Sequence, residues 1–183
     1  MRIIAGSRRS LPLKAPKGID TRPTQDRTKE TLFNILRDDV YDARFLDLFA
    51  GSGAIALEAL SRGARHAVMV ENAREAVSCI RQNISFTRFE DCAELMECDV
   101  LTALKRLEGQ PPFDIIFMDP PYRLGIEPQV MRILSEARYV TEDTIVIVEA
   151  ALDTPTDFAD KNGFDIYRTK DYKTNRHIFM RRK

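Results

Sequence analysis

The sequence predicts a doubly wound α/β fold built on a mostly parallel sheet, and three observations support this. Five short apolar runs alternate with stretches of helical apolar spacing between residues 44 and 150. The first run leads into a Gly-x-Gly turn, Gly51-Ser52-Gly53, that opens the next helical stretch. Two further apolar runs, at 164–169 and 177–181, are separated only by the polar residues 170–176. The alternation indicates parallel strands with helical crossovers, and the final pair indicates a C-terminal antiparallel hairpin that closes the sheet.

The individual elements can be assigned in chain order. Residues 1–22 are basic and rich in Gly and Pro, so we expect a small hairpin arm there, outside the main core. Thr24 is expected to cap a helix that runs to about Asp38. Strands are predicted at 44–49, 67–71, 93–97, 113–118 and 144–150, and helices at 53–62, 73–86, 100–107 and 128–137. We expect a single domain over 1–183, in which the arm precedes a helix and catalytic core at 23–183.

The composition is that of an ordinary globular protein. Of the 183 residues, 44% are hydrophobic and 31% are charged, and the apolar runs are only as long as strands. We therefore expect no membrane segment and, because no secretory signal pattern follows Met1, a cytoplasmic location. The three cysteines include no Cys-x-x-Cys pair, so neither a disulfide framework nor a metal site is expected. We expect the protein to be a monomer.

The net charge of zero conceals two basic ends. Residues 1–40 carry nine Lys or Arg against five Asp or Glu, and residues 161–183 carry eight against two, so the ends are +4 and +6 and the middle is −10. A fold that brings the ends to one face would present a positive surface to a polyanion such as RNA. Solvated basic termini are the alternative interpretation.

The cofactor half of the predicted site follows the first strand. The segment Phe45-Leu46-Asp47-Leu48-Phe49-Ala50-Gly51-Ser52-Gly53 leads from a strand through a turn into a helix, where α/β sheets bind nucleotide-like ligands. Glu71 ends the next strand, 24 residues after Asp47, and could accept hydrogen bonds from both hydroxyls of a ribose. Asp99 ends the third strand and could accept from an adenine amino group or cap the next helix. These features fit a dinucleotide and S-adenosylmethionine alike, because residues 51–56 also satisfy the pattern G-x-G-x-x-A.

The tetrapeptide Asp119-Pro120-Pro121-Tyr122 follows the fourth strand and separates these two cofactors. The two prolines end the strand and prevent an immediate helix, so we expect a stiff loop. It could hold the Asp119 carboxylate and the Pro120 carbonyl as two acceptors, with Tyr122 as a stacking face for an unpaired base. This arrangement fits an exocyclic amino group, and Asp119 is expected to be ionised so that it stabilises the charge that develops on the nitrogen. A dehydrogenase has no evident use for such a loop, so the sequence favours methyl transfer.

Together these motifs resemble the RsmD-type methyltransferases. The resemblance rests on Asp47 to Gly53, on Asp119 to Tyr122, and on an N-terminal stretch with the pattern RPT-x-DR-x-KE-x-LFN at residues 22–34. It implies a class I, Rossmann-like methyltransferase fold, S-adenosylmethionine as cofactor, and the N2 amine of a guanine in 16S ribosomal RNA of the small subunit as target. It also implies catalytic roles for Asp119, Pro120 and Tyr122, and RNA contacts from Arg22, Arg27, Lys29 and Arg123. The cofactor contacts expected on this basis are Asp47, Phe49, Ala50, Gly51, Ser52, Gly53, Glu71, Asn72, Asp99 and Val100.

Several alternatives remain open at this point. The catalytic loop fits guanine N2 and adenine N6 alike, so an adenine-N6 methyltransferase on DNA or RNA is the first alternative. A non-catalytic, nucleotide-binding ribosome assembly factor is the second. Arg22, Arg27 and Lys29 could contact phosphate or hold the arm onto the domain, and Arg27 and Lys29 could instead lie on a solvated helix face. His66 and His177 are given no role, since a lone histidine near a strand edge is usually structural.

Overall fold

The computed structural model describes residues 1–16, 26–121 and 125–183. Within this part of the chain, seven strands form one sheet in the order β3-β2-β1-β4-β5-β7-β6. The first five strands are parallel, and β7 pairs antiparallel with both β5 and β6. This confirms the predicted α/β fold with a C-terminal antiparallel hairpin. The strands are β1 (Arg44–Asp47), β2 (His66–Val70), β3 (Ala93–Met96), β4 (Ile115–Met118), β5 (Ile145–Ala151), β6 (Phe164–Asp171) and β7 (Asn175–Arg182).

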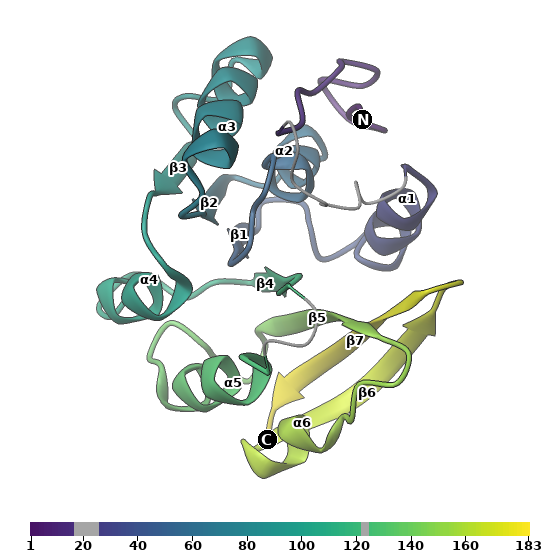
Figure 1. The fold of residues 1–183 in the computed structure, drawn as a ribbon, viewed down its shortest axis with the longest axis vertical. Helices are drawn as coiled ribbons and strands as arrows, with labels where there is room; N and C mark the ends of the chain where they lie inside the picture. Colours follow the sequence, from purple (N-terminus) through teal and green to yellow (C-terminus); the bar gives the residue numbers. More distant parts are fainter. Residues whose placement is uncertain (17–25, 122–124) are drawn as a thin grey trace.

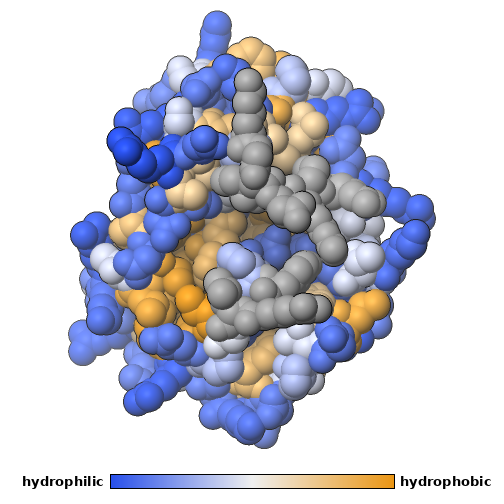
Figure 2. Space-filling model, viewed as in Figure 1, coloured by the Kyte–Doolittle hydropathy of each residue, from blue (hydrophilic) through white to orange (hydrophobic). Residues whose placement is uncertain are grey.

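Helices cover both faces of the sheet (Figure 1). One face carries α1 (Asp26–Ile35), α2 (Ala54–Ser61) and α3 (Arg74–Thr87). The other face carries α4 (Val100–Arg106), α5 (Glu127–Glu136) and α6 (Asp157–Lys161). In the same orientation, hydrophilic residues form most of the outline of the molecule, and hydrophobic residues show mainly toward its middle (Figure 2). None of the helices in the described ranges is long and apolar enough to cross a membrane.

The short apolar runs become strands because both of their faces are buried. All four residues of β4 are buried, and their side chains alternate between the two cores. Ile115 and Phe117 belong to the core under α1, α2 and α3, whereas Ile116 and Met118 belong to the core under α4, α5 and α6. Successive side chains of a strand point to opposite faces, so a strand that is covered on both faces needs an uninterrupted run of apolar residues. The residues that follow the parallel strands then meet at one edge of the sheet, which positions the candidate site.

The N-terminal arm forms the expected hairpin contacts but is part of the core. The Ile3 N–H donates to the Leu11 carbonyl at 3.0 Å, and the Leu13 N–H donates to the Met1 carbonyl at 3.1 Å. Ile3 and Leu13 are buried in the same hydrophobic cluster as α1 and α2, so the expectation of an arm outside the main core is wrong. The shared cluster supports the single-domain organisation over 1–183, which stays a prediction. Thr24, the expected helix cap, lies outside the described residues, and α1 ends at Ile35 rather than near Asp38.

The C-terminal region differs from the prediction in two ways. The short helix α6 precedes the hairpin and was not predicted from the sequence. The strands β6 and β7 extend through most of the polar segment 170–176, with Asp171 paired with Arg176. That segment was interpreted as a loop because it is polar. Polar residues are nevertheless compatible with an edge strand, and β6 is exposed at every position after Phe164.

Candidate active site

The Gly-x-Gly turn after β1 is hydrogen-bonded to Glu71, the residue that directly follows β2. Gly51 and Gly53 have φ angles of 56° and 77°, a left-handed conformation that glycine adopts without strain. The Gly51 N–H donates to Oε2 of Glu71 at 2.9 Å, while Oε1 of Glu71 accepts the N–H groups of Asn72 and Ala73, each at 2.9 Å. A Cβ atom added at Gly51 would meet no atom within 4 Å, so the turn is open on that side. A ligand could therefore approach its backbone closely.

Asp47, the last residue of β1, is a buried carboxylate with an unused acceptor. Only 1% of the residue is exposed, and its Oδ1 has no hydrogen-bond partner among the described residues. Burial raises the pKa of Asp47 to about 7, and the Glu71 charge adds to this, while the backbone N–H groups of Phe49 and Ala56 act in the opposite direction. A buried, unsatisfied acceptor is costly unless a ligand supplies a donor. Asp47 therefore fits a ligand with N–H donors or a positive charge.

The remaining predicted cofactor contacts lie along the same edge of the sheet. Ala50, Ser52 and Val100 are buried, Phe49 is half-buried, and Asn72 and Asp99 are exposed. Asp99 caps α4, because its Oδ1 accepts the Thr102 N–H at 3.0 Å and its Oδ2 accepts the Thr102 hydroxyl at 2.7 Å. These hydrogen bonds lower the pKa of Asp99, which keeps it an ionised acceptor. The capping role is thus present, and the contact between Asp99 and adenine stays a prediction.

The predicted catalytic loop begins directly after β4, next to β1. Leu48, which follows Asp47, donates its N–H to the Phe117 carbonyl at 2.9 Å, so the ends of these strands are adjacent. Asp119 is half-buried and Pro120 is buried. Burial raises the pKa of Asp119 well above its usual value, and the charges of Glu149 and Asp47 raise it further. An ionised Asp119, as expected from the sequence, therefore needs a positive charge or N–H donors beside it. Tyr122, Arg123 and Arg22, which were also predicted as site residues, lie outside the described residues.

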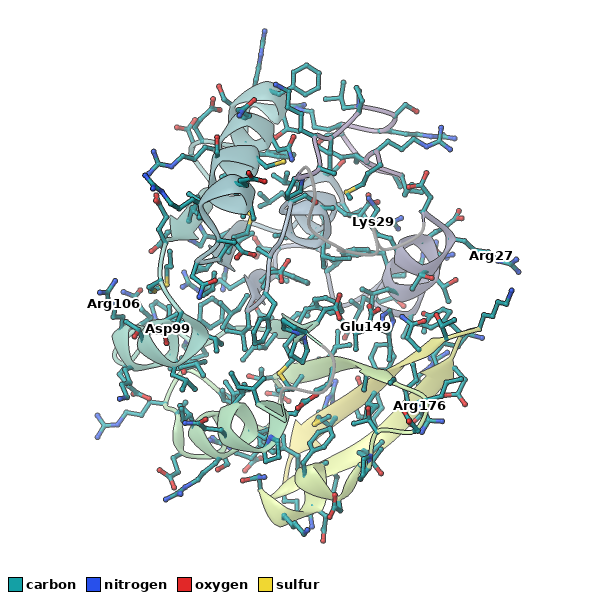
Figure 3. The ribbon with its side chains drawn as sticks, viewed as in Figure 1. Arg27, Lys29, Asp99, Arg106, Glu149 and Arg176 are labelled. Carbon is teal, nitrogen blue, oxygen red and sulfur yellow. The ribbon has the colours of Figure 1, made fainter. Side chains whose placement is uncertain are left out.

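A buried polar cluster beside Asp119 was not predicted from the sequence. Glu149 on β5 lies opposite His177 on β7, and their Oε2 and Nε2 atoms are 2.9 Å apart. The Tyr172 hydroxyl lies 3.1 Å from Nδ1 of the same histidine, and Asn175 donates to Oε1 of Glu149. The sequence carries one signal of this cluster, a glutamate inside the otherwise apolar strand β5. Glu149 lies near the centre of the view in Figure 3.

The two predicted RNA contacts on α1 differ in their surroundings. Arg27 is exposed and points away from the body of the protein, whereas Lys29 is fully buried (Figure 3). The Lys29 Nζ atom donates to the Arg2 carbonyl at 2.5 Å and lies 3.5 Å from Oε2 of Glu58. Burial lowers the pKa of Lys29, and the neighbouring Glu58 charge acts in the opposite direction. The prediction of an RNA contact at Lys29 is therefore wrong, because its ammonium group is enclosed and holds the arm onto the domain.

Glu58 completes this attachment of the arm. Its two carboxylate oxygens accept the N–H groups of Ile4 at 2.7 Å and Ala5 at 3.0 Å, and Arg62 pairs with it at 2.8 Å. Gly6, the next residue of the arm, approaches the same helix so closely that a Cβ atom there would lie 1.8 Å from the Ser61 carbonyl oxygen. The arm thus lies directly on α2, against Glu58 and Ser61 in the second turn of the helix and beyond.

Comparison with known proteins supports the motif-based resemblance. Residues 1–181 match the profile of the family described as "Conserved hypothetical protein 95". The chain belongs to this family. One relative is "Ribosomal RNA small subunit methyltransferase D" of Haemophilus influenzae. It is 35% identical to this chain, and the match covers 85% of this chain and 81% of that protein. The "Putative rRNA methyltransferase YlbH" of Bacillus subtilis is 36% identical, covering 81% of this chain and 82% of that protein.

A solved structure gives the same result for the fold. The "Putative methyltransferase yhhF from Escherichia coli" superposes with a TM-score of 0.86 and 32% sequence identity, covering 100% of this chain and 98% of that chain. This chain therefore has the class I, Rossmann-like methyltransferase fold. Its resemblance to the RsmD-type family is confirmed.

Proposed function

We propose that this protein transfers a methyl group from S-adenosylmethionine to the exocyclic N2 amine of a guanine in 16S ribosomal RNA of the small subunit. The observation that carries the proposal is that Asp119 and Pro120 follow β4 at the same edge of the sheet at which the Gly51–Gly53 turn follows the neighbouring parallel strand β1. The names of the most similar relatives support ribosomal RNA as the substrate class. A cytoplasmic, monomeric enzyme is proposed as well.

The residues of this edge fit S-adenosylmethionine in charge and in hydrogen bonding. The unpartnered Oδ1 of Asp47 matches a ligand ammonium donor, and the open side of Gly51 leaves room for a ligand against the backbone. The Glu71 carboxylate already accepts three backbone N–H groups, which leaves about one of its four acceptor sites, on Oε2, for a ribose hydroxyl. When bound, S-adenosylmethionine would supply the methyl group on a positively charged sulfur. That charge would favour the ionised forms of Asp47 and Asp119, whose pKa values burial raises.

The loop after β4 supplies what an exocyclic amine lacks. The nitrogen of such an amine is a poor nucleophile because its lone pair is delocalised into the ring of the base. An ionised Asp119 and the Pro120 carbonyl would accept its two N–H groups, favour a pyramidal nitrogen and stabilise the developing positive charge. Holding the nitrogen in line with the methyl group would provide most of the remaining acceleration.

The hairpin of β6 and β7 offers a positive surface next to this edge. Its tip lies beside the carboxyl end of β5, where Ala151 pairs with Asn175. Three exposed cations of the hairpin, Arg168, Lys170 and Lys173, have no carboxylate partner at ion-pair distance within the described ranges. Arg27 and Arg176 lie on the same side of the molecule in Figure 3, away from Arg106. We propose that Arg27 and the three hairpin cations contact RNA phosphates.

Replacing Arg168, Lys170 and Lys173 by alanine is expected to weaken RNA binding and to reduce the slope of log affinity against log salt by about 2, because each phosphate contact releases counterions. The measurement is a salt titration of binding to small ribosomal subunits. A matched control replaces three exposed cations of the α4 and α5 side, Lys105, Arg106 and Arg132. Equal losses in both variants would mean that the hairpin has no special role. Unchanged binding with increased aggregation would mean that its cations only protect an edge strand.

The function itself is tested by identifying the product. The protein is incubated with labelled S-adenosylmethionine and with small subunits that lack their usual methylation, and the RNA is then digested to nucleosides. We expect N2-methylguanosine on subunits and none on naked RNA. N6-methyladenosine would favour the adenine alternative. Cofactor binding without any labelled nucleoside would favour the assembly factor.

A further inference from the structure

The proposed chemistry leaves one buried carboxylate beside the catalytic loop without a role. Glu149 on β5 is only 5% exposed. The register pairs Met118 of β4 with Val148 of β5, so Asp119 and Glu149 occupy the next position on two neighbouring parallel strands. Residues at equivalent register positions of adjacent strands point to the same face. Glu149 is therefore the nearest strand neighbour of Asp119 on the β5 side.

Glu149 is held in place by donors from the end of the hairpin. Asn175 donates to Oε1, and His177 lies 2.9 Å from Oε2. An ionised carboxylate only accepts, so Nε2 of His177 carries the hydrogen of this contact. The neutral ring can then accept the Tyr172 hydroxyl at Nδ1, 3.1 Å away, and Phe117 packs against the ring edge at 5.9 Å between centroids. With Glu149 as the acceptor, each of these three polar contacts has one donor and one acceptor.

We propose that Glu149, fixed by Asn175 and His177, is a positioning residue that makes Asp119 the acceptor of the proton released by the methylated amine. The inference rests on the proposed methyl transfer. Atoms and charge balance when the nitrogen–methyl bond forms, the electron pair of the broken carbon–sulfur bond stays on sulfur, and the nitrogen's proton passes to the Asp119 carboxylate. The positive charge on sulfur and the negative charge on Asp119 then disappear together.

The negative charge of Glu149 favours proton uptake by Asp119, because a second negative charge on Asp119 is unfavourable beside the first. Of the charged neighbours of Asp119, Glu149 raises its pKa most and Asp47 adds a smaller effect. Among the residues that the structure describes, the other titratable groups around the cluster are Glu71, which faces Asp47, and His177, Tyr172 and Arg168 on the hairpin side. Burial raises the pKa of Tyr172 to about 12, so its hydroxyl remains protonated at neutral pH. A carboxylate whose pKa lies closer to neutral pH is a more effective proton acceptor.

The test is the variant Glu149→Gln, which removes the charge and keeps nearly the same shape. Carbon-13 NMR of labelled Asp and Glu side chains follows the titration of Asp119 in the protein without RNA, with Asp119→Asn as the assignment control. We expect the midpoint of Asp119 to fall by about one pH unit or more, because a like charge has been removed. In single-turnover methylation the acid limb of the rate profile should move to lower pH, since Asp119 then loses its proton earlier. The plateau rate should fall by up to about tenfold for each pH unit by which the midpoint falls, because Asp119 becomes a weaker base.

Glu58→Gln is the matched control, because Glu58 is also a buried carboxylate but lies under the arm. It should lower stability and leave both the midpoint and the acid limb unchanged. An unshifted Asp119 midpoint in Glu149→Gln, or equal shifts in the two variants, would overturn the proposal. A shifted midpoint in a protein that methylates no RNA would instead refute the proposed function and leave the effect of Glu149 on Asp119 intact.

The wild-type protein provides a second test that does not depend on the folding of a variant. In the same carbon-13 titration, the Asp119 midpoint of the wild-type protein should lie well above that of an ordinary aspartate. A midpoint at the ordinary value would mean that no neighbouring charge raises it, and the proposal would be wrong.

Discussion

Asp119→Ala is expected to lower the rate of methyl transfer by about a hundredfold to a thousandfold, the usual loss when a fixed group that stabilises transition-state charge is removed. The alanine side chain can neither accept an N–H of the amine nor balance the charge on its nitrogen. Single-turnover methylation of small subunits measures the loss. Cofactor affinity should change little, because the Gly51–Gly53 turn and Glu71 are attached to each other independently of this loop.

Asp119→Asn separates two contributions of the same side chain. The amide oxygen still accepts a hydrogen bond, but the side chain cannot take up the proton, so the variant should lie between wild type and Asp119→Ala. Full activity of Asp119→Ala, with unchanged RNA binding, would contradict a catalytic role for this side chain.

Lys29→Met is expected to reduce the free energy of unfolding by about 3 kcal/mol, because removing one member of a buried ion pair leaves the other uncompensated. Glu58 would keep Arg62 and two backbone donors but lose its fully buried cation, and the Arg2 carbonyl would lose its donor. Urea denaturation measures the change. The folded fraction should still bind RNA with the wild-type salt dependence, since Lys29 does not reach the surface.

Arg27→Met is the matched control on the same helix. Arg27 is exposed, so its removal should leave stability nearly unchanged and weaken RNA binding. Equal destabilisation by the two substitutions would show that the buried pair contributes nothing special. Loss of RNA binding only in Lys29→Met would restore the interpretation that the sequence suggested.

The fold could be predicted from local patterns because the central strands β1, β2, β4 and β5 are buried on both faces. A run such as Ile115 to Met118 shows this directly, and the Gly-x-Gly turn shows where the first helix begins. The edge of the sheet at which the site lies follows from the parallel order alone. The ends of β6 and β7 could not be predicted, because the polar sequence of an exposed edge strand cannot be distinguished from the polar sequence of a loop.

The errors at the site come from contacts between distant segments. Lys29 lies on an amphipathic helix, and only the position of Glu58 on another helix shows that it is enclosed. His177 stands alone in the sequence, and its partner Glu149 is 28 residues away, joined to it by the antiparallel register of β5 and β7. No spacing rule within one element identifies such a pair. A glutamate inside an apolar strand was the one available indication.

The order of the strands has a consequence for how the protein is made. β7 follows β6 in the chain but lies between β5 and β6 in the sheet. While a ribosome is still synthesising β7, the neighbouring side of β5 has an unpaired backbone, which is a site for pairing with other nascent chains. The same delay postpones the arrival of His177 and Asn175 at Glu149. Nascent chains that stop short of Asn175 should therefore bind chaperones and lack the completed catalytic edge.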